Sequence, residues 1–289
     1  MNGTPLRNSR RPIAVAAALA GMVSLAIGAH AALNKPLGQP TPAVAAAQAS
    51  DTVKESAKGA AKLALVIGNG HYPDAGAPLI QPINDARALT SALRRDGFDV
   101  DVVEDASRDD MDRAIARLQS KIRPDSVVML FFGGYGVQSG RESYMIPVDA
   151  AIWRESDVRR HGISIESVLG MIKERGARAR LAVIDASRRN PYERRFRAFS
   201  HGLAPITAPD NALVLTSATP GKVADDTADQ HSALMTELLQ NLNTPSAAEA
   251  LFNTTRLAVS RASAGEQVPQ VSSSLVEDVR LGTAENAGS

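Results

Sequence analysis

The run VVMLFFGGYG, residues 127–136, decides the fold of this chain. Its first six residues are apolar without polar alternation, which is typical of a strand buried on both faces. Two further runs, residues 63–67 and 181–184, have the same character and also end in small or polar residues. Strands of this kind belong to parallel sheets that helices cover on both sides.

Segments with helical spacing separate these strands. Asn84 is predicted to cap a helix that ends at Gly97. Further helices are expected over residues 111–122, 164–176, 231–242 and 247–260, and further strands over residues 100–103, 144–148, 212–215 and 273–279. The alternation predicts an α/β three-layer sandwich with a mostly parallel central sheet of about six strands and helices on both faces.

The first sixty or so residues differ in composition. Three arginines at positions 7, 10 and 11 precede an uncharged run, and Ala29-His30-Ala31 fits a small-x-small cleavage site. Residues 1–31 are therefore expected to be a signal peptide or, because the run is near the length that spans a bilayer, an N-terminal membrane anchor. Residues 32–61 are predicted to be a flexible Ala/Pro-rich linker, residues 62–281 the folded domain, and residues 282–289 a disordered tail.

Composition narrows the functional classes. Lys plus Arg is 32 and Asp plus Glu is 31, so the net charge of +1 gives no electrostatic reason to expect a nucleic-acid partner. The chain contains no cysteine, which excludes disulfides, thiolate nucleophiles and cysteine-ligated metals. Either form of the N-terminal segment exports the domain, so we expect it in the periplasm or tethered to the inner membrane.

Parallel sheets carry their chemistry at the carboxyl ends of the strands. The ends predicted here are Gly68-Asn69-Gly70-His71, Gly134-Tyr135-Gly136, Asp185-Ala186-Ser187-Arg188 and Thr216-Ser217-Ala218. A dinucleotide-binding fingerprint is incomplete, because the third glycine after Gly68-Asn69-Gly70 is missing. A phosphate-binding loop is absent from the sequence, because no Gly-Lys pair follows a glycine at the required spacing. A nucleophile elbow is also absent, because Ser187 is not flanked by the glycines of G-x-S-x-G.

Several segments in order resemble the caspase-like peptidases of clan CD (peptidase C14), in particular their bacterial metacaspase-like branch. The matching segments are Leu65-Val66-Ile67-Gly68-Asn69, Asn84-Asp85-Ala86, Gly134-Tyr135-Gly136, Tyr144 with Pro147-Val148-Asp149, Asp185-Ala186-Ser187-Arg188-Arg189-Asn190-Pro191, Gln267-Val268-Pro269 and Ser272-Ser273-Ser274-Leu275. The resemblance covers about residues 62–281 and implies a caspase-like fold.

The resemblance places Tyr135 where the family has its catalytic histidine and Ser187 where it has its catalytic cysteine. A thiol beside an imidazole supplies a thiolate near neutral pH, whereas serine needs a general base and a phenol with a pKa near 10 is a poor one. We therefore expect no peptide cleavage. The two side chains are expected to hydrogen-bond across the strand ends, while a retained ligand-binding role stays open.

Acidic residues near the predicted site suggest a ligand. Asp185 matches the family aspartate that binds a basic side chain, and Asp225 is expected to contribute to the same pocket. Asp225, Asp226 and Asp229 form a loop that is expected to be solvated, with calcium as the alternative. No cofactor and no resident metal are expected.

Three functional hypotheses follow. The leading one is an exported, proteolytically inactive caspase-like protein that binds a peptide or protein with basic residues. The second is an active endopeptidase or serine hydrolase in which Ser187 is activated by a displaced histidine such as His71. The third is a structural domain with a vestigial cleft.

Overall fold

The computed structural model describes residues 60–73, 78–192, 202–224 and 229–282. The predicted signal peptide or anchor, nearly all of the linker and of the tail, and Asp225 therefore lie outside the described residues. Within the described ranges, a helix with the length and apolarity needed to cross a bilayer was not found.

A six-stranded sheet forms the centre of the domain, in the order β10-β8-β7-β3-β1-β2. All neighbouring pairs are parallel except β10 with β8, which is antiparallel. The predicted α/β fold with a mostly parallel sheet is thus confirmed. The strands are β1 (Lys62–Gly68), β2 (Asp99–Glu104), β3 (Val127–Gly133), β7 (Ala179–Asp185), β8 (Ala212–Thr216) and β10 (Gln270–Ser273).

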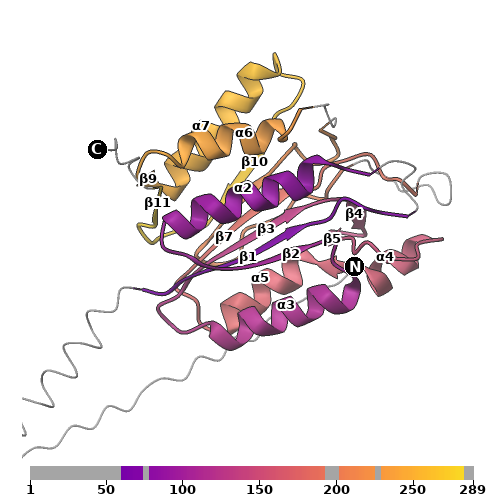
Figure 1. The fold of residues 1–289 in the computed structure, drawn as a ribbon, viewed down its shortest axis with the longest axis horizontal. Coiled ribbons are helices and arrows are strands. Elements are labelled where there is room, and N and C mark those ends of the chain that lie inside the picture. The colour runs from indigo at the N-terminus through magenta and orange to yellow at the C-terminus, as the bar shows by residue number, and fades with distance from the viewer. Residues whose placement is uncertain (1–59, 74–77, 193–201, 225–228, 283–289) are drawn as a thin grey trace, which may run out of the picture. The chain divides into compact units, whose positions relative to one another are not determined.

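Helices cover both faces of this sheet (Figure 1). One face packs against α2 (Gln81–Arg95), α6 (Ala233–Asn241) and α7 (Ala248–Ala262), and the other against α3 (Arg108–Lys121) and α5 (Ile165–Glu174). Alternate residues of a strand enter opposite cores, so Phe131 joins the first helical layer and Leu130 the second. A strand with both faces buried needs the continuous apolar run that the sequence shows.

Smaller elements surround the carboxyl ends of the strands. A three-stranded sheet follows β3, and a third apolar cluster lies beside it, with Tyr72, Tyr135 and Tyr192 among its buried residues. The remaining elements are β4 (Gly136–Ser139), β5 (Glu142–Met145), α4 (Glu155–His161), β6 (Ile163–Ser164), β9 (Ser246–Ala247) and β11 (Arg280–Leu281).

Two predicted boundaries were wrong. Asn84 does not cap the first helix, because α2 already begins at Gln81 with a proline in its first turn, and Asn84 instead donates to the carbonyl of Gln230 at 3.1 Å. The last strand was placed at residues 273–279, whereas β10 ends at Ser273. β10 is an edge strand of four partly exposed residues, so it lacks the apolar run that marked the central strands.

Candidate functional site at the carboxyl ends of the sheet

The register of the central strands sets the position of the site. Gly68 of β1, Gly133 of β3 and Asp185 of β7 are in register, so the three strands end at one edge. Past that edge the backbones stay paired, because the N–H of Gly136 donates to the carbonyl of Ala186 at 3.0 Å. Tyr135 and Ser187 therefore lie on neighbouring segments.

A buried tyrosine fixes the turn after β3. The hydroxyl of Tyr72 donates to the carbonyl of Ile146 at 2.9 Å and accepts from the N–H of Tyr135 at 3.1 Å. Gly134, at φ +154°, allows this approach, since a Cβ there would lie 2.6 Å from the Tyr72 hydroxyl. The rings of Tyr72 and Tyr135 meet edge to face with centroids 4.8 Å apart. Burial raises the pKa of Tyr72 far above its ordinary value, so this phenol stays neutral.

The hydroxyl of Ser187 has no hydrogen-bond partner among the described residues. The side chain is 1% exposed, and its backbone is well held: the N–H donates to Oγ of Ser217 at 3.3 Å, and the carbonyl accepts from Ala224 at 2.7 Å. The prediction that Tyr135 and Ser187 hydrogen-bond to each other was therefore wrong. Tyr135 packs its ring against Tyr72 in the third apolar cluster instead, and Ser187 Oγ has no base in contact with it.

His71 is held elsewhere. Its Nδ1 lies 2.5 Å from Oδ2 of Asp105, and its side chain is 67% exposed, while Ser187 is buried. Burial alone would raise the pKa of Asp105, but hydrogen bonds from the N–H groups of His71 and Gly70 outweigh it and lower that pKa. The carboxylate therefore stays ionised and keeps His71 at the surface. In this arrangement His71 does not activate Ser187.

Asp185 and Arg188 form a buried ion pair. Oδ1 of Asp185 lies 3.7 Å from Nη1 of Arg188, and both side chains are 4% exposed. The same Nη1 donates to the carbonyl of Gly134 at 3.0 Å and to the carbonyl of Asp185. Oδ2 of Asp185, in contrast, is buried without a hydrogen-bond partner in the described part of the chain. A buried carboxylate oxygen left unpaired is costly and needs a reason.

A second buried carboxylate, Asp85 of α2, belongs to the site and was missed as a site residue in the sequence. It is 0% exposed, its Oδ1 lies 2.7 Å from Nδ1 of His231, and its Oδ2 accepts from the N–H of Ser232 at 3.3 Å. Burial raises the pKa of Asp85, and the negative charge of Asp185 raises it further, to about 6. The sequence showed Asp85 only as part of the Asn84-Asp85-Ala86 segment that matches the family, 100 residues from Asp185, and assigned it no role in the site.

The predicted acidic loop is mostly outside the described residues. Asp225 and Asp226 fall in the range 225–228, so their place relative to Asp185 is not described, whereas Asp229 is exposed. In the described ranges, a group of three His, Asp or Glu side chains suited to a metal ion is not found.

Comparisons of the sequence and of the structure with known proteins agree on one family. A sequence model of the caspase domain matches residues 61–280. The human protein named mucosa-associated lymphoid tissue lymphoma translocation protein 1 is 28% identical over 136 residues, which covers 46% of this chain, and its mouse homologue is equally similar. The alignment spans 16% of the length of either relative.

A solved structure agrees on the fold. The crystal structure of caspase-1 from Spodoptera frugiperda superposes with a TM-score of 0.55 over 78% of this chain and 92% of that one, at 15% identity. At this identity the likeness shows the fold alone. The predicted caspase-like sandwich is confirmed.

Proposed function

The chain belongs to the caspase-domain family, and from that premise we propose that it is a non-catalytic member that binds a peptide or protein segment through a buried acidic pocket. The pocket is formed by Asp85 and Asp185, and the ligand group it takes is the side chain of an arginine or lysine. The observation that carries the proposal is the carboxylate oxygen of Asp185, buried and without a partner in the described chain.

The charges of the pocket favour a cation. Oδ1 of Asp185 lies 3.7 Å from Nη1 of Arg188, which is close enough for an ion pair but too long for a hydrogen bond. Oδ2 of Asp185 has no hydrogen-bond partner in the described ranges. Burial raises the pKa of Asp85, and the negative charge of Asp185 raises it further, so the ionised form of Asp85 is disfavoured in these surroundings. A guanidinium or ammonium group entering the pocket relieves both, because it pairs with Oδ2 and offsets the repulsion.

The neighbouring residues do not support peptide cleavage. The chain has no cysteine, Ser187 Oγ makes no hydrogen bond to a base among the described residues, and we assign Tyr135 and Ser187 to the positions of the family histidine and cysteine. Loss of a nucleophile and its activator removes several orders of magnitude in rate.

Burial of the two carboxylates has a kinetic consequence. Asp85 is 0% exposed and Asp185 is 2% exposed, so a ligand reaches them only after the residues that cover them move. Association is then expected to be slower than for an open site.

The setting of this activity comes from the sequence alone. The basic and apolar N-terminal segment, Ala29-His30-Ala31 included, supports export to the periplasm or a tether at the inner membrane. The partner is then an exported or surface segment that presents a basic side chain. The near-zero net charge gives no support to a nucleic-acid ligand.

The experiment compares two peptides that differ only in charge. A fluorescein-labelled peptide with a central arginine and its citrulline counterpart are titrated with the full chain, and polarisation is measured. We expect the arginine peptide to bind and the citrulline peptide to bind at least about tenfold more weakly. Asp185→Asn should abolish this preference. Asp99→Asn, at the opposite end of the sheet and paired with Lys121, is the matched control and should keep it.

Two results would count against the proposal. Equal binding of both peptides, or an unchanged preference in Asp185→Asn, would remove the acidic pocket from the account. Labelling of the wild-type chain by a fluorophosphonate probe, lost in Ser187→Ala, would favour the serine hydrolase instead.

A further inference from the structure

Arg256, on α7, is a half-buried cation without a partner in the described chain. Its Nε is buried and makes no hydrogen bond, and no carboxylate of the described residues pairs with its guanidinium. The other buried or half-buried arginines in the described ranges each pair with an acid or donate to a carbonyl, although the Nε atoms of two of them also lack a hydrogen bond; they are Arg108, Arg178, Arg180 and Arg188, and the two are Arg178 and Arg180. A guanidinium without a carboxylate partner in the described chain is available to pair with an anion from outside.

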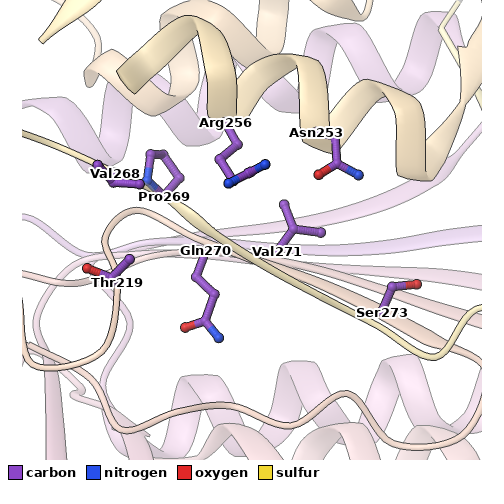
Figure 2. A pocket seen from close by; sticks show the side chains of 8 residues that line it. All are labelled: Thr219, Asn253, Arg256, Val268, Pro269, Gln270, Val271 and Ser273. Carbon is purple, nitrogen blue, oxygen red and sulfur yellow. The ribbon is translucent and has the colours of Figure 1, made fainter. Parts of the chain in front are cut away.

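A pocket of about 410 Å³ lies at this guanidinium, between α7 and the edge strand β10. Figure 2 shows Arg256 and Asn253 extending from the helix towards the strand, with Pro269 beside Arg256 and Val271 pointing up towards the helix. The remaining lining residues are Thr219, Val268, Gln270 and Ser273. The pocket thus combines one cation and several neutral donors with an apolar floor, and none of its lining residues is acidic.

We propose that this pocket binds a carboxylate carried on an apolar group, with the carboxylate on the Arg256 guanidinium and the apolar part over Pro269 and Val271. A single planar guanidinium matches a carboxylate, whereas a phosphate dianion usually recruits several cations. The apolar floor adds affinity for a hydrophobic body next to the charge.

One end of the pocket is closed to the anion. The hydroxyl of Ser273 donates to Glu249, so that hydroxyl is occupied and a negative charge lies beside it. Repulsion from Glu249 directs the carboxylate to the other end, towards Thr219. Thr219 follows β8, and the Ser217 carbonyl just before it accepts from Gln267 at 2.8 Å, so the segment that carries Thr219 is fixed to the one that leads to β10.

The test uses the full chain labelled with ¹⁵N, with phenylacetate as the probe and phenylacetamide as its neutral analogue. Phenylacetate is expected to shift the backbone amide signals of Thr219, Gln270 and Val271 in a saturable way at millimolar concentration, and phenylacetamide is not. Arg256→Gln should weaken binding by about tenfold or more. Arg261→Gln, an exposed arginine on the same helix, should leave it unchanged.

Two further arms identify the source of the carboxylate and guard against a folding defect. A short peptide ending in Val-Val is compared as free acid and as C-terminal amide: binding of the acid alone assigns a peptide C-terminus, and binding of phenylacetate without the peptide assigns a small acid. Arg256→Lys keeps the stem and charge and should bind with intermediate affinity. The proposal is wrong if neither acid saturates, if the neutral analogues respond equally, or if Arg256→Gln and Arg256→Lys bind like the wild type.

Discussion

Two parts of one sheet edge have opposite chemistry. At the first, Tyr135 and Ser187 lie on neighbouring segments, yet Ser187 Oγ has no partner in the described chain and no base contacts it. At the second, Asp85 and Asp185 are buried near each other, with Arg188 balancing only part of their charge. Under the proposed function, the first part no longer breaks bonds, whereas the second still takes a basic side chain.

The difference between these two parts shows that binding and catalysis place different requirements on the same fold. Binding a basic side chain needs charge, burial and a stable position, and the buried carboxylates of Asp85 on α2 and Asp185 at the end of β7 supply the charge and the burial. Amide cleavage needs in addition a nucleophile and a base in contact. A fold can therefore lose the second requirement by two substitutions while the first stays intact.

The largest effect should come from restoring the dyad. Tyr135→His together with Ser187→Cys places an imidazole beside a thiol, and we expect cleavage after arginine or lysine to rise by about 10³-fold or more over the wild type. A fluorogenic peptide assay measures it. Each single substitution should stay far below the double variant, because Ser187→Cys lacks an imidazole to activate the thiol and Tyr135→His keeps the weaker hydroxyl nucleophile of Ser187. A folded double variant that binds arginine peptides but does not cleave them would contradict this assignment of positions.

The next effect concerns the charge balance of the acidic pocket. Arg188→Met leaves the Asp185 carboxylate buried without its cation, and we expect a loss of about 3–5 kcal/mol in the free energy of unfolding. Urea denaturation measures it. Asp185→Asn added to Arg188→Met should recover part of the loss, since no charge is then stranded. A change of less than about 1 kcal/mol in the single variant would mean that the ion pair is unimportant.

A smaller effect is expected from pH. Burial and the Asp185 charge raise the pKa of Asp85 to about 6, so the carboxyl is ionised above that pH and protonated below it. Affinity for an arginine peptide should therefore be full at pH 7 and fall by up to about tenfold per unit as the pH drops below 6. Asp85→Asn should flatten this profile. Equal wild-type affinity at pH 5 and pH 7 would be inconsistent with a pocket charged by Asp85.

The smallest effect compares two buried serines. Ser217 Oγ accepts from the N–H of Ser187, whereas Ser187 Oγ has no hydrogen bond in the described chain. Ser217→Ala should cost about 1 kcal/mol in the free energy of unfolding, and Ser187→Ala should be neutral or slightly stabilising. Thermal denaturation of both variants checks this order. A Ser187→Ala variant that loses more stability than Ser217→Ala would show that the Ser187 hydroxyl has a structural role.

The sequence predicted the parts of the molecule that follow from local patterns. The apolar runs of β1, β3 and β7 had to be strands buried on both faces, and their polar ends had to meet at one edge. The short helix α4 was not predicted, because its seven residues include few apolar ones. β10 was misplaced, since an edge strand with three polar residues has no clear period.

The sequence could indicate some of the residues that form the site, but not all of them and not how their side chains are arranged. Tyr135, Ser187 and Asp185 could be singled out because each ends or follows a predicted strand and matches a functional position in the resemblance to the caspase-like family. The lack of a partner for Ser187 Oγ depends on side-chain directions that no local pattern encodes. Asp85 lies on a helix far away in sequence, and its link to Asp185 is a through-space interaction of charges.

The most direct test of the central claim is mass spectrometry of an arginine-containing peptide mixture after incubation with the purified wild-type chain and with Ser187→Ala. A site with no thiolate and no base should leave every peptide intact in both samples, while the bound fraction carries arginine or lysine. A fragment produced by the wild type and absent with Ser187→Ala would contradict the account.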